Sequence, residues 1–368
     1  MKEFIYSSLF GELVRQVKAR FDAASKLHKE LFDKVQFEDF LEWDTPTIGL
    51  NFEELMGKYN ITVAAPTIGD NSNESVLATE GLETFANKVF LHAITRTMTV
   101  QEYRKVLSIL DSKTISDEAA KQELVKIMWG QVTDPVNSVR AKIDLIFLRS
   151  LSNEGKFTFD TTTNPEGGVR GQIDFNQPEA NIATATTEWT DANKATVDCL
   201  EDIMAMVEKA EGKIAPKYIL AAPSKIAYML KTAKMRQAIL GSNNASGILT
   251  LAQMNNYLLE NELPQFKKMR RHVRVKNGTT VTEIDAWNPK NIVFVPDGKL
   301  GLVKNAYADN ELKQEAGVAY SNYGRIRVSQ WGVGEKEHSR QTEYTKAQSL
   351  SLPVITEIGG VYTLKTES

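Results

Sequence analysis

Two strand-like runs of the sequence are separated by a polar stretch that is too long for an ordinary turn. The first run is Ile61–Val63 and the second is Lys88–Ile94, and both carry β-branched residues. The segment between them, which contains Pro66, Gly69 and Gly81, has few candidates for a core. A two-stranded hairpin of this kind does not stabilise itself in water. The sequence therefore predicts a projecting hairpin that must lie on another surface.

The segment before this hairpin is predicted to be helical and rich in aromatic residues. Apolar residues recur at spacings of three and four over Phe10–Phe21, and a second apolar set follows over Leu27–Leu41. Two interpretations remain open. The segment is either a helical subdomain packed on the body of the chain, or an arm that buries aromatics such as Phe32, Phe37 and Phe40 against another subunit.

The longest helical pattern lies between Thr99 and Glu154. Asp134-Pro135 is expected to restart a helix there, with the aspartate as N-cap and the proline at the first helical position. At 1.5 Å per residue this helix spans about 25–30 Å, which makes it a candidate for the spine of a domain. Its predicted buried stripe consists of Val136, Val139, Ile143, Ile146 and Phe147.

Beyond this helix the sequence mixes strands and helices without regular alternation, and this predicts an α+β fold. One hairpin is expected to face Phe157–Phe159 toward Ile173–Phe175, and another is centred on Asn277-Gly278. The other expected elements are an edge or linker over Pro178–Thr187, a helix from Thr190 to Gly212 with Val197, Leu200, Met204 and Val207 inward, buried strands at Lys217–Ala222 and Asn291–Pro296, a helix that begins at Pro223, and a closing hairpin over Val354–Leu364.

The sequence shows no recognisable active site. It contains no P-loop, no G-x-S-x-G elbow and no G-x-G-x-x-G turn, and its carboxylates are scattered. The lone Cys199 excludes an internal disulfide framework and is expected to be a buried small hydrophobe. None of the four histidines lies within metal-ligand spacing of another histidine or of the cysteine: His28, His92, His272 and His338. We therefore expect no catalytic residue, no metal and no cofactor, with a soluble enzyme of novel site as a remote alternative.

The overall charge argues against a protein that coats nucleic acid. The chain has 44 Lys and Arg against 47 Asp and Glu, a formal net charge of −3. Its one basic cluster covers residues 267–276, where Arg274 and Lys276 would share an outward strand face and Val273 and Val275 would face a core. That face either contacts DNA or an acidic neighbour, or is simply solvated. No apolar run reaches the roughly 20 residues of a membrane span.

Six stretches occur in an order that is recognisable as a whole. They are the aromatic run Leu27–Phe40 followed by Thr45–Asn51, the strand and helix of Lys88–Val106, the long helix and strand of Val136–Asp160, the Trp189-led helix with the strand of Pro216–Ser224, Ile292–Gly301, and the closing segment Leu352–Leu364. This order resembles the tailed-bacteriophage major capsid proteins of the Hong Kong 97 type, and most closely the lambda-like capsid protein E group.

The resemblance implies an α+β capsid fold with five parts. These are an N-terminal arm (1–56), an extended β-hairpin or E-loop (57–98), a peripheral domain with the spine helix (99–180), an axial domain (181–319) and a return to the peripheral domain (320–368). The implied function is self-assembly into an icosahedral shell that encloses phage genomic DNA. An encapsulin-type cellular nanocompartment is the alternative.

The resemblance also implies partners. We expect homo-oligomers, as hexamers and pentamers of a virion built in the bacterial host cytoplasm, with a separate scaffolding protein, a portal and, in some systems, a decoration protein. DNA is expected inside without sequence-specific binding, and no membrane contact is expected. Arg274 and Lys276 are candidates for contact with DNA or a neighbour. The candidate assembly residues are Asp70, Asn71, Glu74, Glu83 and Lys88 of the hairpin and Phe32, Phe37 and Phe40 of the arm.

Overall fold

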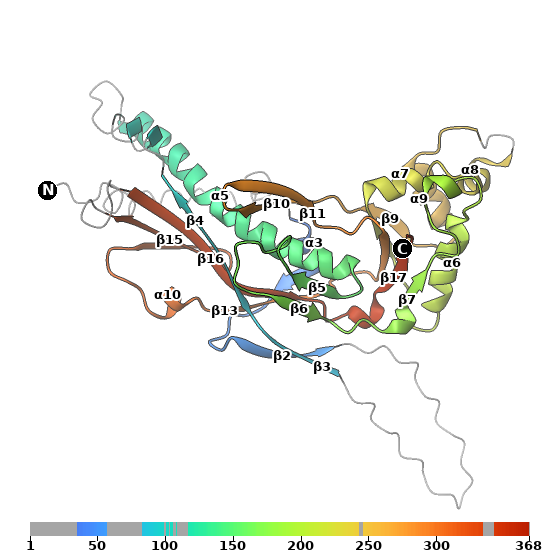
Figure 1. The fold of residues 1–368 in the computed structure, drawn as a ribbon, viewed down its shortest axis with the longest axis horizontal. Helices are drawn as coiled ribbons and strands as arrows, with labels where there is room; N and C mark the ends of the chain where they lie inside the picture. The colour runs from blue at the N-terminus through green and yellow to red at the C-terminus, as the bar shows by residue number, and fades with distance from the viewer. Residues whose placement is uncertain are drawn as a thin grey trace, which may run out of the picture.

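A computed structural model describes residues 35–56, 83–98, 101–102, 104–105, 108, 117–242, 246–333 and 342–367. At 54–56, 83–86, 117–129 and 342 only the backbone is described. One long helix, α5 (Asp117–Ser152), runs along an elongated molecule (Figure 1). A six-stranded sheet packs against it, and a five-stranded sheet covered by helices forms one end of the molecule. The predicted mixture of helices and strands is present.

Helix α5 is continuous through Pro135, so the predicted restart of a helix at Asp134-Pro135 is wrong. A proline fixes φ near the helical value, and its main cost inside a helix is one lost N–H donor and local crowding. Arg96 supports the helix at this point, because its Nη1 donates to the carbonyl of Gly130 at 2.9 Å and pairs with Asp134. The predicted buried stripe is confirmed from Val136 onward.

The six-stranded sheet gathers segments from the whole length of the chain. Its strands are β1 (Leu41–Trp43), β13 (Gly301–Ala306), β16 (Thr342–Val354), β15 (Ile326–Val333) and β14 (Ala319–Tyr323), in this order, with β4 (Phe90–Thr97) also paired to β16. The 13-residue strand β16 is long enough to pair with β13 at one end and with β15 at the other. It also lies against α5, and so forms the centre of this layer.

The five-stranded sheet joins two hydrophobic cores. Its order is β7 (Ile182–Thr184), β17 (Tyr362–Lys365), β12 (Asn291–Val295), β8 (Tyr218–Ala221) and β9 (Gln265–Lys268). Every residue of β12 is buried, as predicted. Because side chains alternate along a strand, Ile292 and Phe294 enter the core under the end helices, whereas Val293 enters the core shared with α5.

Four helices cover the far face of this sheet: α6 (Cys199–Lys209), α7 (Pro223–Met229), α8 (Ala233–Leu240) and α9 (Leu251–Glu260). The predicted start of α6 at Thr190 is wrong, because the helix begins at Cys199 after Asp198, whose side chain caps the amide of Glu201. Its inward residues are Cys199, Ile203 and Met206, whereas Met204 is 46% exposed. The buried face of α6 is therefore rotated about the helix axis relative to the predicted face, which included Met204.

The predicted closing hairpin over Val354–Leu364 is also wrong. β16 ends at Val354 in the six-stranded sheet, and β17 lies in the five-stranded sheet. The 3-10 turn η4 (Ile358–Gly360) lies between them. Side chains distant in sequence fix this crossing: Gln177 donates to the carbonyl of Val361 at 3.0 Å, and Asn181 donates to that of Gly359 at 2.8 Å.

Three two-stranded ribbons complete the described chain. They are β2 (Asn51–Met56) with β3 (Glu83–Lys88), β5 (Lys156–Phe159) with β6 (Gly171–Asp174), and β10 (His272–Asn277) with β11 (Thr280–Asp285). The last two ribbons confirm the hairpins predicted there. The predicted strand Lys88–Ile94 is divided, because buried Val89 donates to Leu50 and turns the chain from β3 into β4. The other predicted strand, Ile61–Val63, lies outside the described residues.

Three short elements lie beside the sheets: α3 (Phe37–Phe40), the 3-10 turn η1 (Glu179–Asn181) and α10 (Asp309–Leu312). A further 3-10 turn, η2 (Asp191–Asn193), precedes α6. The segment predicted as an edge or linker over Pro178–Thr187 contains the edge strand β7.

Candidate assembly surfaces

The first described residues pack on their own subunit. Phe37 is completely buried and Phe40 is 7% exposed, and both lie in α3. The Phe40 ring lies 5.9 Å from that of Phe147 on α5, and the Phe37 ring lies 5.9 Å from that of Trp43. These side chains serve the core of one subunit, which corrects the expectation that they face another. Phe32, the third predicted aromatic, lies outside the described residues.

A buried carboxylate fixes this packing. Asp144 of α5 accepts hydrogen bonds from the amides of Gln36 at 3.0 Å and Phe37 at 2.8 Å, and its Oδ2 lies 3.2 Å from Nε of Arg271. Burial raises the pKa of Asp144 to about 6, against the opposing effects of the Phe37 amide and Arg271. The residue joins the arm, the long helix and the entry to β10. Asp144 was not among the predicted site residues, although a carboxylate within a run of buried apolar residues is a recognisable signal.

The β2–β3 ribbon points away from the body of the molecule (Figure 1). Lys88, at the end of β3 nearest the body, is exposed and its Nζ lies 5.9 Å from the centroid of the Phe90 ring. The backbone of Glu83 lies opposite Met56 at the other end of the ribbon. Three of the predicted hairpin residues lie outside the described residues: Asp70, Asn71 and Glu74.

An apolar patch surrounds the base of this ribbon. Ile48 is 75% exposed, Leu50 is 48% exposed and Leu91 is 56% exposed. Ile48 and Leu50 lie in the loop that leads into β2, and Leu91 lies two residues after Val89, whose amide donates to the carbonyl of Leu50 at 2.9 Å. Exposed apolar side chains gathered in this way favour contact with another protein surface. We call these residues the root patch.

The β10–β11 ribbon has the side-chain arrangement that its alternation predicts. Val273 is buried, whereas the side chain of Arg274 is 78% exposed and Lys276 is exposed as well. Ile284 on β11 is paired with Val273 and is also buried, so one face of the ribbon packs on the core. Arg274 and Lys276 lie together on the other face.

Acidic residues of the same ribbon offset this basic face. His272 is paired with Asp285, and its Nδ1 lies 2.6 Å from the carboxylate. Arg274 is paired with Glu283, whose carboxylate lies 3.9 Å from its Nε. Two members of the basic cluster, His272 and Arg274, therefore face acids of β11, whereas Lys276 lies opposite Val281.

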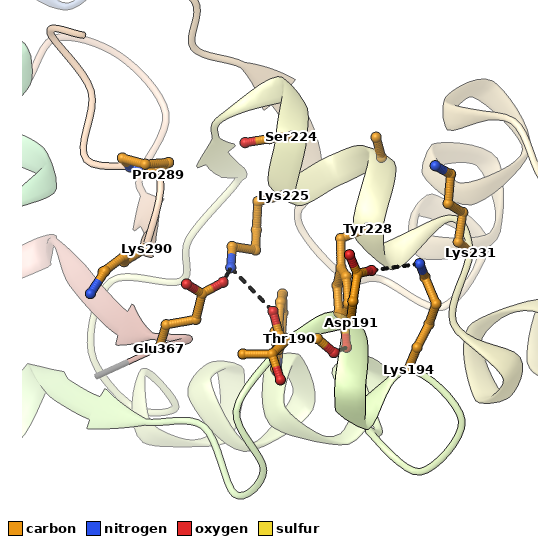
Figure 2. A pocket seen from close by; sticks show the side chains of 12 residues that line it. Thr190, Asp191, Lys194, Ser224, Lys225, Tyr228, Lys231, Pro289, Lys290 and Glu367 are labelled. Atoms are coloured by element: carbon orange, nitrogen blue, oxygen red, sulfur yellow. Dashed lines mark hydrogen bonds and ion pairs between the residues drawn. The ribbon is translucent and has the colours of Figure 1, made fainter. Parts of the chain in front are cut away.

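A pocket of about 500 Å³ lies between α7, the turn η2 and the C-terminal segment (Figure 2). The ammonium of Lys225, whose side chain is 5% exposed, pairs with Glu367 and lies 3.5 Å from the carbonyl of Trp189. Lys194 pairs with Asp191 at 2.7 Å. Further lining residues are Thr190, Ser224, Ala227, Tyr228, Lys231, Pro289 and Lys290. Lysines thus dominate its charge.

No pattern in the sequence identified this pocket. Lys225 and Glu367 are 142 positions apart, and only the tertiary fold brings them together. The tail reaches the pocket because the amide of Thr366 donates to the carbonyl of Lys290 at 2.9 Å, and its own carbonyl accepts from the amide of Trp189 at 2.8 Å.

Two of the groups considered for chemistry at the sequence level, Cys199 and His92, are buried. Cys199 is fully buried, and desolvation raises the pKa of its thiol to about 12, so the thiolate is strongly disfavoured. Burial lowers the pKa of His92 to about 4, and its Nε2 lies 3.1 Å from the carbonyl of Ser351. Both side chains serve packing.

Across the described ranges, no group of three or more His, Cys, Asp or Glu side chains is arranged to hold a metal ion. In the same ranges, every helix is too short or too polar to cross a membrane.

The family model described as phage major capsid protein E matches residues 55–366. Among solved structures, a protein assigned as a prophage capsid protein of E. coli CFT073 is 15% identical, with 95% of this chain and 98% of that chain covered and a TM-score of 0.60. The mature capsid of bacteriophage PhiM1 is 11% identical, with 91% and 87% covered and a TM-score of 0.46. Among curated proteins, none matches the sequence.

The family match and the likeness to the prophage capsid protein confirm the predicted fold class. The match to the prophage protein covers nearly the full length of both chains, so the long helix, both sheets and the ribbons together correspond to a Hong Kong 97-type capsid fold.

Proposed function

The chain belongs to the phage major capsid protein E family, and we propose that its copies form pentamers and hexamers in which the β2–β3 ribbon of each copy lies across a neighbour. Members of this family are structural proteins rather than enzymes, and the protein is a virion component that assembles with copies of itself into a shell.

The observation that supports this arrangement is the ribbon with its root patch. A two-stranded ribbon that points away from its own subunit gains stability only from another surface. The patch of Ile48, Leu50 and Leu91 exposes apolar area that water disfavours. A neighbouring copy that covers the ribbon and the root patch would support the ribbon and remove the exposed apolar area from water.

The finer organisation follows the same proposal. Residues 99–180 and 320–368 would form the peripheral domain around α5, residues 181–319 the axial domain, residues 57–98 the hairpin and residues 1–56 the arm. The β2–β3 pairing favours an earlier start of the hairpin, at Asn51.

The proposal extends to other partners. Assembly would take place in the host cytoplasm, guided by a separate scaffolding protein, with a portal at one vertex and room for a decoration protein. Genomic DNA would be enclosed without sequence-specific contacts. The charge matching of Arg274 by Glu283 supports contact of β10–β11 with protein or solvent over contact with DNA.

The test is electron microscopy of the purified wild-type protein and of the variant Leu91→Asp. We expect closed particles from the wild type and at least a tenfold lower yield of particles from the variant, because a carboxylate in a covered apolar contact is strongly disfavoured. Leu312→Asp is the matched control, since Leu312 is also 56% exposed but lies on α10.

Circular dichroism should show both variants to be folded, because both side chains are exposed in the subunit. If Leu91→Asp assembles as well as Leu312→Asp, the root patch is not a contact. A wild-type protein that remains a compact monomer in all salt and scaffold conditions would contradict shell assembly itself.

A further inference from the structure

The pocket between α7, η2 and the C-terminal segment, which we call the lysine pocket, has one lysine outside its two internal ion pairs that meets no carboxylate of the described residues. Lys225 pairs with Glu367, and Lys194 pairs with Asp191. Lys231 is exposed at the mouth of the pocket and, within the described ranges, no carboxylate lies within ion-pair distance of it. It still acts on Asp191 at longer range, since it contributes to the lowered pKa of that carboxyl after the larger effect of Lys194. The mouth is therefore positively charged.

Apolar surface accompanies this charge. Ala227 is exposed on α7, and the half-buried ring of Tyr228 lines the same pocket. The Tyr228 hydroxyl donates to the carbonyl of Thr190 at 2.7 Å, which fixes the ring in place. A ligand that suits this mouth has acidic groups on either side of an apolar one.

Helix α6 carries such a sequence on its outward face. Glu201, Met204 and Glu208 are all exposed, and their spacing of three and four residues places them in one stripe. Met204 is 46% exposed, so its flexible thioether side chain is available for an apolar contact. We call these three residues the α6 stripe. Figure 1 shows α6 at the outer edge of the end formed by the five-stranded sheet and its helices, with α7 nearer to the body.

We propose that the lysine pocket of one copy receives the α6 stripe of a second copy, with Lys231 and Lys290 facing the two glutamates and Tyr228 contacting Met204. The proposal rests on the shell assembly proposed above. Because pocket and stripe are different surfaces of the same chain, the contact is heterologous, and repetition of such a contact closes into a ring when the rotation allows it.

Charge and apolar complementarity favour a protein occupant over nucleic acid. A phosphodiester backbone offers no apolar group to Ala227 and Tyr228, whereas Met204 does. The described lining of the pocket also contains no arginine, the residue best suited to bidentate phosphate contacts.

Charge reversal tests the pairing directly. We expect Lys231→Glu with Lys290→Glu to reduce the yield of closed particles at least tenfold, and Glu201→Lys with Glu208→Lys to do the same. Combining all four substitutions should restore the yield to within about threefold of wild type, because the attraction is re-formed with opposite sign. The matched control is Lys268→Glu with Lys313→Glu, which makes the same charge change at exposed lysines outside the pocket.

Each alternative has its own outcome. If both reversals block assembly but the fourfold variant does not recover, the two surfaces do not face each other, and a pocket that binds nucleic acid would give this result. If either reversal alone assembles normally, the proposal is also overturned. Circular dichroism of every variant confirms that the exposed substitutions leave the subunit folded.

A second measurement does not depend on shell closure. Lys231→Cys with Glu208→Cys, treated with a short bis-maleimide, should give a ladder of covalent multimers on denaturing gels, and either cysteine alone should give none. The native Cys199 is buried and does not interfere. A ladder from open rings would support the contact even if closed particles never formed. The absence of any ladder from closed particles would overturn the contact and leave shell assembly intact.

Discussion

The ribbons β10–β11 and β2–β3 have the same size but opposite relations to the rest of the subunit. Each has two antiparallel strands of six residues. β10–β11 buries Val273 and Ile284 in the core shared with α5. β2–β3 leads away from the body, and Phe52 near its base packs against that core.

Further contacts hold β10–β11 at both ends. At the turn, the amide of Gly278 donates to Glu166 at 2.8 Å. At the open end, Arg149 of α5 donates to the carbonyl of Asp285 at 3.0 Å, and Arg271 pairs with Asp144. Strand length and pairing alone therefore do not decide whether a ribbon is a stable part of the subunit. A ribbon is a stable part of the subunit only when another layer packs against it. For β2–β3 we expect that layer to come from another chain.

The largest expected effect comes from removing the anchor of the β10–β11 ribbon. Asp144→Ala should lower the free energy of unfolding of the subunit by about 3–5 kcal/mol, because it removes the buried carboxylate that pairs with Arg271 and accepts from the amides of Gln36 and Phe37. Chemical denaturation of the dissociated subunit measures this change.

Asp144→Asn is the control for that variant. Its amide oxygen still accepts from the amides of Gln36 and Phe37, so it should lose less stability than Asp144→Ala. A loss below about 1 kcal/mol for Asp144→Ala would contradict the role of this carboxylate as an anchor.

A smaller effect is expected from truncating the buried face of the ribbon. Ile284→Ala should lower the free energy of unfolding by about 2–3 kcal/mol, since Ile284 is only 9% exposed in the core. Val281→Ala on the same strand should change it by less than about 0.5 kcal/mol, because Val281 is 58% exposed. Thermal and urea unfolding of both variants compare the two faces, and equal losses would contradict the packing of this ribbon on the core.

Local patterns in the sequence predicted the elements that depend on near neighbours. The alternation of Val273 and Arg274 and the buried strand β12 are present as predicted. The predicted hairpin turn is also present, but it lies at Gly278-Thr279, one residue later than expected, because Asn277 pairs with Thr280. In each case the pleat or the turn residue determines the local geometry without help from distant segments.

Elements that depend on distant segments were not predictable in the same way. The apolar spacing around α6 predicted that Met204 faces inward, whereas the helix begins after the Asp198 cap and buries Ile203 and Met206 against the sheet. The segment after Val354 crosses from one sheet to the other because Gln177 and Asn181 bind its backbone. No local pattern carries that information.

The candidate surfaces also differ in whether a local sequence pattern or the tertiary fold forms them. Arg274 and Lys276 were found from alternation, but the acid opposite Arg274, Glu283, became clear only from the pairing with β11. The lysine pocket escaped detection, since Lys225 meets Glu367 only through the tertiary fold. The proposed role of the hairpin followed from its polarity and still rests on that argument.

Hydrogen exchange distinguishes the two ribbons without any substitution. In the dissociated subunit, amides in the β2–β3 ladder should exchange faster than those in the β10–β11 ladder, because fewer packed side chains oppose opening. On assembly, exchange of the β2–β3 amides should slow at least about tenfold, equivalent to about 1.4 kcal/mol of opening free energy.

The β10–β11 amides serve as the internal control in that experiment. Their exchange should change by less than about twofold on assembly, because their supporting layer belongs to the same subunit. Equal slowing of both ribbons would mean that both depend on neighbours, and the contrast between them would be lost.

The smallest expected effect concerns the charges of β10–β11. Glu283→Gln removes the acid opposite Arg274, where the two side chains are 53% and 78% exposed. Stability should change by less than about 0.5 kcal/mol, as for other exposed ion pairs. Binding of the dissociated subunit to a short DNA duplex at low salt should become about two- to threefold tighter, because Arg274 is no longer offset. Glu315→Gln, at an exposed position outside the ribbon, is the matched control and should change neither quantity.

The same measurement decides what the basic face of the ribbon does. If β10–β11 were a DNA contact already, Arg274→Ala with Lys276→Ala would weaken binding to the duplex severalfold and reduce its salt dependence. We expect a change of less than twofold, because Glu283 lies opposite Arg274 and Asp285 lies opposite His272, so DNA would meet two carboxylates on the same face of the ribbon. A severalfold loss would show that the cross-strand acids do not offset these cations, and β10–β11 would then be an internal surface of the shell that faces the packaged DNA.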